Sequence, residues 1–201
     1  MEINKIIFAS NNAGKIKEMQ DILSDVEIPI LSAREAGIEE EAEENGKTFF
    51  ENAWKKADLI TQKTGEWAVA DDSGLCIEAL NGEPGIFSAR WAGEGKGDWD
   101  LVNYALERMK QVPDGQRRAW FESAVVLISP AGEYWHFTGR IYGIITHSPQ
   151  GDMRTHLPYD LIFIPDGYNI TFAQMSGEEK NNLSHRGEAF RRISEFIKNN
   201  I

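Results

Sequence analysis

Cysteine is almost absent from this chain, in which Cys76 is the single cysteine among 201 residues. One cysteine excludes an intramolecular disulfide framework, and no cysteine pair or histidine cluster has the spacing of a zinc site. The chain has no apolar run of about eighteen residues, and its first residues lack the pattern of a signal peptide. We therefore expect a cytoplasmic protein without a membrane span.

Basic residues are also scarce, since 21 Lys and Arg stand against 32 Asp and Glu, a formal net charge of −11. Such a chain repels a phosphate backbone, so neither nucleic acid nor an anionic membrane is expected as a partner. A phosphate-bearing ligand would have to meet a local basic cluster or a metal ion. Apolar residues make up 41% of the chain, enough for the core of one domain over residues 1–201.

The apolar periodicity predicts alternating strands and helices in the first half of the chain. Strands are expected at 3–9, 28–31, 67–70 and 161–164, a long hairpin at 118–129 and 133–146, and helices after Lys15, from Thr48, over 98–110 and over 184–197. The strand over 67–70 is expected to stop at Asp71. This order predicts a mixed α/β fold with a mixed sheet.

The segment Ser10-Asn11-Asn12-Ala13-Gly14-Lys15 connects the first strand to the first helix. Free backbone N–H groups and the helix dipole favour an anion at such a junction. The spacing is not that of a Walker A loop. The alternative is a simple turn in which Asn and Gly adopt positive φ and the lysine is solvated.

Two adjacent carboxylates, Asp71 and Asp72, follow the apolar strand over 67–70. Consecutive strand residues point to opposite faces, so one of the two is expected to face an interior, where a carboxylate needs a partner or a metal ion. Glu44, from a run of glutamates, could join them in an all-oxygen site for Mg²⁺ or Mn²⁺. The alternative is a turn or helix cap formed by Asp72 and Ser73.

His185 and Arg186 fall in the first turn of the last predicted helix, where the helix dipole disfavours cations. This conflict indicates an anionic partner at the helix start. The alternative is an exposed basic turn paired with Glu178, Glu179 or Glu188.

Six segments, taken in order, carry a resemblance to a known family. They are Ser10-Asn11-Asn12-Ala13-Gly14-Lys15, Glu44-Asn45-Gly46, Glu51-Asn52-Ala53 with Lys56-Ala57, Ala70-Asp71-Asp72-Ser73-Gly74-Leu75, Pro84-Gly85-Ile86 with Ser88-Ala89-Arg90, and Glu179-Lys180-Asn181 with Ser184-His185-Arg186-Gly187. Together they span nearly the whole chain. In these segments the chain resembles the inosine triphosphate pyrophosphatase family.

The resemblance implies a mixed, twisted sheet with flanking helices, built as two lobes around a central cleft, and a homodimer. It implies Mg²⁺-dependent hydrolysis of ITP, dITP and XTP to the monophosphate and pyrophosphate in a locally basic site. By matching position it implies catalytic roles for Asp72 and Lys56 and metal ligation by Glu44, Asp71 and Asp72. The implied substrate contacts are Ser10, Asn11, Asn12, Ala13, Gly14, Lys15, Ser73, Arg90, Leu157, Pro158, Tyr159, Asp160, Lys180, His185 and Arg186.

The chain departs from the family in the segment expected to meet the base, which reads His156-Leu157-Pro158-Tyr159-Asp160-Leu161 where Gly-Phe-Gly-Tyr-Asp-Pro is common. Leu157 thus stands at the position of a stacking aromatic ring. Two alternatives follow, namely a nucleotide-binding or regulatory module without useful turnover, and a pyrophosphatase with another base preference.

Overall fold

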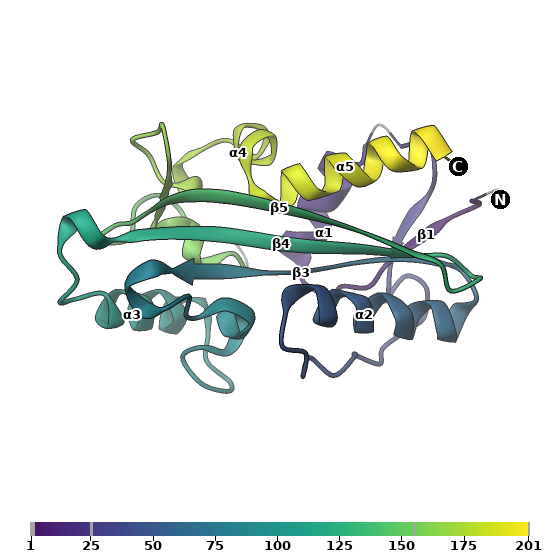
Figure 1. Ribbon diagram of the computed structural model, residues 1–201, viewed down its shortest axis with the longest axis horizontal. Helices are drawn as coiled ribbons and strands as arrows, with labels where there is room; N and C mark the ends of the chain where they lie inside the picture. Colours follow the sequence, from purple (N-terminus) through teal and green to yellow (C-terminus); the bar gives the residue numbers. More distant parts are fainter. Residues whose placement is uncertain (1–2, 25, 155, 201) are drawn as a thin grey trace. The chain divides into compact units, whose positions relative to one another are not determined.

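A computed structural model describes residues 3–24, 26–154 and 156–200 (Figure 1). The strands are β1 (Ile6–Phe8), β2 (Ile30–Ser32), β3 (Trp67–Ile77), β4 (Arg118–Ile128), β5 (Tyr134–Ile145) and β6 (Phe163–Pro165). The α-helices are α1 (Ala13–Ile22), α2 (Phe49–Thr64), α3 (Asp98–Arg108), α4 (Gly177–Leu183) and α5 (His185–Asn200). The strands form one sheet in the order β2-β1-β3-β4-β5-β6, in which β1 is parallel to β2 and β3, and β6 is antiparallel to β5. The predicted mixed α/β fold with a mixed sheet is confirmed.

The chain divides into two compact units. The first contains the described residues of Met1–Asp72, Ser123–Gly139 and Arg186–Ile201, and the second those of Ser73–Glu122 and Arg140–His185. The single two-lobed domain over residues 1–201 stays a prediction.

In the first unit, alternate residues of the strands face two separate apolar cores. One core packs Phe8, Val69 and Leu127 against α1 and α5, and the other packs Ile7, Ala70 and Val126 against α2. Figure 1 shows α2 on one side of the sheet and α5 on the other. The two-residue period of a strand therefore decides which helix each side chain of β3 meets.

In the second unit, α3 and the ends of the long strands enclose one apolar core, with Leu75, Val102 and Phe121 among its buried members. Arg117 is only 3% exposed beside this core. Its guanidinium group donates to the carbonyl oxygens of Ile145 (2.8 Å), Met109 (2.8 Å), Val112 (3.1 Å) and Thr146 (2.7 Å). One side chain thus joins the end of β5 to the chain that follows α3.

Several predicted elements have different bounds, and the predicted end of one strand is wrong. The strand over 67–70 does not stop at Asp71, because β3 continues through both aspartates to Ile77. The turn or cap formed by Asp72 and Ser73 is therefore also wrong. Helix α4 was not predicted, although the spacing of Ser176 and Glu179 is that of the capping box observed there.

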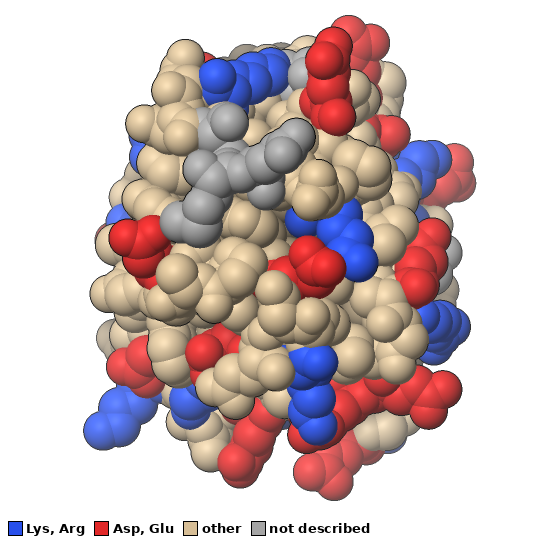
Figure 2. All heavy atoms as spheres, turned by 90° about the vertical axis from the view of Figure 1, so that its right-hand side faces the viewer, with Lys and Arg blue, Asp and Glu red and all other residues tan. Residues whose placement is uncertain are grey.

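Charges of both signs lie side by side on the face drawn in Figure 2. In the first unit, exposed pairs such as Lys63 with Glu40 (2.5 Å) and Lys5 with Glu66 (3.1 Å) join neighbouring segments. Such exposed pairs stabilise a fold by about 1 kcal/mol at most. Among the described residues, no helix has the length and apolar character needed to cross a membrane.

Candidate active site

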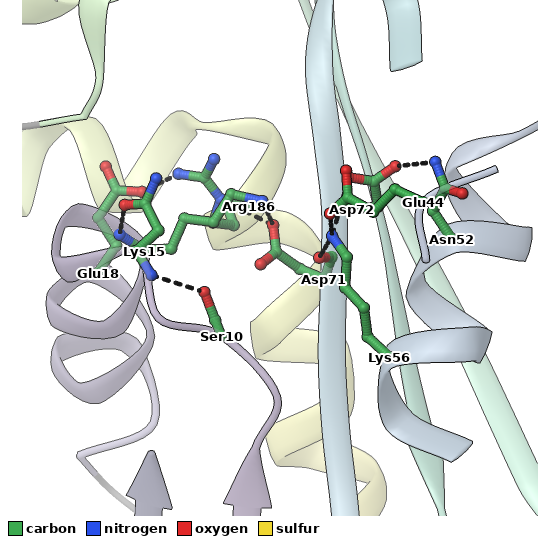
Figure 3. Close-up of polar contacts among 10 residues, drawn as sticks. Ser10, Lys15, Glu18, Glu44, Asn52, Lys56, Asp71, Asp72 and Arg186 are labelled. Carbon is green, nitrogen blue, oxygen red and sulfur yellow. Dashed lines mark hydrogen bonds and ion pairs between the residues drawn. The ribbon is translucent and has the colours of Figure 1, made fainter. Parts of the chain in front are cut away.

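The side chains of Asp71 and Asp72 point from β3 to opposite faces of the sheet (Figure 3). Asp71 lies on the same face of the sheet as Val69 and contacts residues of α1 and α5. Asp72 lies on the same face as Ala70 and contacts residues of α2. Both side chains are buried, at 1% and 6% exposed. The sequence prediction that the two carboxylates point apart is confirmed, and the strand carries both of them into the interior.

Asp71 lies in a buried ion-pair network. Its Oδ2 is 3.0 Å from Nζ of Lys15 and 3.3 Å from Nε of Arg186. Arg186 also pairs with Glu18 of α1, and its own side chain is 6% exposed. Burial alone would raise the pKa of Asp71, but the charges of Lys15 and Arg186 outweigh it and hold that pKa well below its usual range.

Asp72 lies among residues from α2 and the preceding loop. Its Oδ2 accepts a hydrogen bond from Nδ2 of Asn52 at 3.0 Å, and its Oδ1 is 3.3 Å from Nζ of Lys56. The same ammonium group is 2.5 Å from Oε1 of Glu44. Burial raises the pKa of Asp72 above its ordinary value, and this effect together with that of Glu44 exceeds the opposing effect of Lys56. The two adjacent aspartates therefore have opposite pKa shifts.

The loop before α1 forms a helix start rather than a flexible turn. Asn12 is the N-cap, with its side-chain oxygen accepting from the N–H of Lys15 at 3.0 Å. Ser10 Oγ accepts from the N–H of Asn12 at 3.3 Å. Ala13 and Gly14 therefore lie in the first helical turn, where backbone N–H groups point out of the helix. The alternative of a turn with positive φ and a solvated lysine is wrong, because Lys15 is partly buried and paired with Asp71.

The charged groups around Asp71 and Asp72 in the described part of the first unit carry no excess of positive charge, and the locally basic site stays a prediction. Four carboxylates, those of Glu18, Glu44, Asp71 and Asp72, meet three cations, those of Lys15, Lys56 and Arg186. Each of these cations already contacts a carboxylate. A strongly anionic ligand therefore needs further positive charge at this place.

At the start of α5, buried contacts explain how basic residues can lie where the helix dipole disfavours cations. Arg186 has the anionic partners that the sequence indicated, but they are Asp71 and Glu18 of the same chain. The alternative of an exposed turn is wrong, because both His185 and Arg186 are buried. His185 belongs to the second unit, where its ring stacks on Phe121 with centroids 4.8 Å apart.

The segment expected to meet a base lies in the second unit and is held by several contacts. The hydroxyl of Tyr159 donates to the carbonyl oxygen of Ser88 at 2.8 Å, and burial raises the pKa of Tyr159. Asp160 pairs with Lys180 at 2.5 Å, and both side chains are almost fully buried. These contacts fix the short helical turn Pro158–Leu161, in which Pro158 is also buried.

Three other predicted contact residues of the second unit are more accessible. Leu157 is partly buried just before this turn, and Ser73 is partly buried on β3. Arg90 ends the 3₁₀ helix Gly85–Arg90, with its guanidinium group 5.1 Å from the ring centre of Phe87.

The comparisons with known proteins agree with one another. The sequence pattern of the Ham1 family matches residues 6–196. This chain belongs to the Ham1 family. It is 42% identical over 202 residues to a dITP/XTP pyrophosphatase of Clostridium perfringens, which covers 98% of each chain. It is 37% identical over 195 residues to a dITP/XTP pyrophosphatase of Bacillus subtilis, covering 97% of this chain and 98% of that protein.

Solved structures give the same result for the fold. The structure of a HAM1 protein from Coxiella burnetii matches with a TM-score of 0.87 at 36% identity, covering 98% of this chain and 99% of that chain. The Ham1 protein of Staphylococcus aureus matches with a TM-score of 0.84 at 36% identity, over 96% and 98% of the two chains. The family inferred from the six sequence segments is confirmed.

The oxygen donors of this Ham1 chain fit a magnesium ion at one place. Mg²⁺ is usually held by one or two carboxylates, with water and phosphate oxygens completing its shell. Glu44 and Asp72 meet this requirement, because their carboxylates converge on one place, where the ammonium group of Lys56 lies 2.5 Å from Glu44 and 3.3 Å from Asp72. Asp71 does not join them, and within residues 3–24, 26–154 and 156–200 no three His, Cys, Asp or Glu side chains form a metal-binding group. Metal ligation by Glu44, Asp71 and Asp72 stays a prediction.

Two residues of the Ham1 site had no role in the sequence prediction. Glu18 lies one helical turn after Lys15 on α1 and pairs with Arg186. Asn52 lies one turn before Lys56 on α2 and bonds to Asp72. Helical spacing places each of them on the same face as a predicted site residue, and this spacing is the signal that could have found them.

Proposed function

We propose that this chain hydrolyses ITP, dITP and XTP to the nucleoside monophosphate and pyrophosphate. The relatives described above are named dITP/XTP pyrophosphatases, and they match over nearly the full chain. The observation that carries the proposal is the placement of Asp72, a buried carboxylate beside Lys56 and Glu44. This combination suits the activation of water next to a phosphate group.

In the proposed reaction, Asp72 acts as the general base. A water molecule attacks the α-phosphorus, and its proton passes to Oδ1 of Asp72. The new bond joins the water oxygen to the α-phosphorus, the bond from this phosphorus to the oxygen that bridges it to the β-phosphate breaks, and pyrophosphate leaves with the bridging oxygen. Burial raises the pKa of Asp72, which makes it a better proton acceptor than an ordinary aspartate. Lys56 keeps a positive charge at this place, because Asp72 and Glu44 raise its pKa more than burial lowers it.

We propose that Glu44 and Asp72 hold Mg²⁺, with Mn²⁺ as a substitute. When bound, the ion neutralises charge on the phosphate oxygens. The charge balance of the first unit supports this requirement, since its four site carboxylates outnumber the three cations.

For the phosphates we propose contacts from the start of α1, where backbone N–H groups and the helix dipole favour an anion. The proposed phosphate contacts are Ser10, Asn11, Asn12, Ala13, Gly14, Lys15, Ser73 and Arg90. Asn11 is exposed, and its amide also donates to Glu41 at 3.0 Å. We infer that Arg186 acts mainly by holding Asp71 and Glu18, because its buried guanidinium group is already paired with both.

For the base we propose contacts from Leu157, Pro158, Tyr159, Asp160, Lys180 and His185. The buried pair of Asp160 and Lys180 gives this segment a fixed shape. A 6-keto purine offers an acceptor where adenine offers a donor, so a site built around donors favours inosine and xanthosine. Leu157, in place of an aromatic ring, supports the second candidate, a pyrophosphatase with a shifted base preference. We also propose a homodimer in the cytoplasm, as the resemblance implies.

Pyrophosphate release measured over a panel of ITP, dITP, XTP, ATP, GTP, CTP and UTP tests the proposal, with Mg²⁺ and with a chelator. Asp72→Asn should lower kcat about a hundredfold or more, because the shape stays while the base and one metal-binding charge are lost. Asp58→Asn is the matched control, because the side chain of Asp58 accepts an exposed hydrogen bond from Gln62 on α2 and, among the described residues, does not contact Asp72, Lys56 or Glu44. Orthophosphate as the product, or near-normal turnover by Asp72→Asn, would contradict the proposal. Binding without turnover would favour the regulatory alternative.

A further inference from the structure

Asn52 connects the loop before α2 to the carboxylate of Asp72 on β3. Figure 3 shows Asn52 beside Asp72. Its side chain is completely buried, at 0% exposed. Its Oδ1 accepts a hydrogen bond from the backbone N–H of Gly46 at 2.8 Å, and its Nδ2 donates to Oδ2 of Asp72 at 3.0 Å. Both ends of the amide therefore have a matched partner, as a buried amide requires.

The contact with Gly46 fixes which way the amide of Asn52 faces. In the reversed orientation, the NH₂ group would face the N–H of Gly46, so that two donors would meet. The carbonyl oxygen would then face the carboxylate of Asp72, so that two acceptors would meet. Both hydrogen bonds would be lost, and the observed orientation is therefore the only one that satisfies all four groups.

Glycine is required at position 46 because the backbone comes so close to Asn52. A Cβ atom there would lie 2.6 Å from Oδ1 of Asn52 and 2.8 Å from Cβ of Glu51. The φ angle of Gly46 is not among the positive ones, so the reason is space and not backbone conformation. Any larger residue would have to push the loop away from α2 and release the amide.

The two oxygens of Asp72 consequently have different partners. Oδ2 is occupied by Asn52, while Oδ1 faces the ammonium group of Lys56 at 3.3 Å. We propose that Asn52, held by the N–H of Gly46, is a positioning residue that turns Oδ1 of Asp72 toward the metal ion and the attacking water. This inference rests on the proposed function, in which Asp72 is the reacting carboxylate.

Two variants test the positioning role from different directions. Asn52→Asp keeps the shape and the acceptor for Gly46, but it places a carboxylate oxygen against Oδ2 of Asp72. Gly46→Ala changes no charge and removes no functional group, but it displaces the amide. In both variants we expect kcat to fall about tenfold or more while KM changes less than about threefold, because a supporting residue acts through the group that it orients.

The matched control is Asn45→Asp, which adds the same charge one residue before Gly46. Asn45 is exposed and its side chain contacts Lys55 rather than Asp72. Its kcat should stay within about twofold of the wild type. A second readout is the Mn²⁺ affinity of the substrate-free protein, measured by electron paramagnetic resonance, which Gly46→Ala should weaken about tenfold. Thermal unfolding shows whether each variant is folded. If Gly46→Ala is not folded, Asn52→Ser replaces it, because this change creates space instead of a steric clash.

Wild-type kcat in Asn52→Asp or in Gly46→Ala would overturn the inference, and so would an equal loss in Asn45→Asp. Failure of the proposed function has a different signature, since the wild type would then release no pyrophosphate from any triphosphate. In that case the Mn²⁺ affinities alone test the positioning role of Asn52. Unchanged Mn²⁺ affinity in Gly46→Ala and Asn52→Ser would overturn that role.

Discussion

Neutralising the two adjacent aspartates should have unequal effects on stability, although Asp71→Asn and Asp72→Asn are the same chemical change. Asp71→Asn leaves the ammonium group of the partly buried Lys15 without its carboxylate partner, while Arg186 keeps Glu18. Breaking a buried ion pair from one side costs about 3 to 5 kcal/mol. For a chain of this size, each kcal/mol lowers Tm by about 2 to 4 °C, so we expect a decrease of roughly 10 °C.

Asp72→Asn should change the free energy of unfolding by about 1 kcal/mol or less. Burial disfavours the charged form of Asp72, so a neutral side chain relieves this cost. Lys56 keeps its contact with Glu44, and the carbonyl oxygen of the new amide can still accept from Asn52. We therefore expect Asp72→Asn to lose activity while its stability changes little, as is common where a site holds an unfavourable charge.

The pH dependence of the Asp71→Asn effect provides a second check. The pKa of Asp71 is lowered in the folded state, so its carboxylate stabilises the fold at pH values above the unfolded pKa of about 3.9. This contribution is lost as the pH falls below that value toward the lower folded pKa. The difference in unfolding free energy between wild type and Asp71→Asn should therefore be complete at pH 7 and smaller at pH values near 3.

Thermal and urea unfolding in the presence of a chelator measure these differences without a contribution from bound metal. Equal midpoints for wild type and Asp71→Asn at pH 7 would refute the reasoning. A larger loss of stability in Asp72→Asn than in Asp71→Asn would refute it as well.

Two further predictions concern the second unit. Arg117→Lys should lower the unfolding free energy by about 2 to 4 kcal/mol, because an ammonium group cannot reach the four carbonyl oxygens that the guanidinium group spans. The neighbouring Arg118→Lys, which alters an exposed pair with Asp166, should cost less than about 1 kcal/mol in the same urea titration, and equal costs would contradict the assignment. Leu157→Phe should raise the ratio of kcat/KM for ITP over ATP, since stacking of a base on an aromatic ring contributes about 1 to 3 kcal/mol. An unchanged ratio would remove Leu157 from the base contacts.

Much of the fold could be predicted from the sequence where local patterns determine local structure. The helix over 49–64 begins after Thr48 because the hydroxyl of Thr48 accepts from the N–H of Glu51 at 3.1 Å, as the capping pattern predicts. The opposite directions of Asp71 and Asp72 follow from the two-residue period of a strand. Both depend on residues that are close in the sequence.

The tertiary structure decided the features that depend on distant residues. The strand over 67–70 continues through Asp71-Asp72-Ser73-Gly74, a turn-forming sequence, although its pairing with β1 ends at Val69, because β4 lies beside β3 in the sheet and can satisfy its backbone groups. The sequence indicated an anionic partner for Arg186, but only packing could show that the partner is Asp71, 115 residues away. Composition and periodicity thus determined which helices and strands form and which kinds of charged groups they carry. Which of those charged groups pair with one another was decided by which helix covers each face of the sheet.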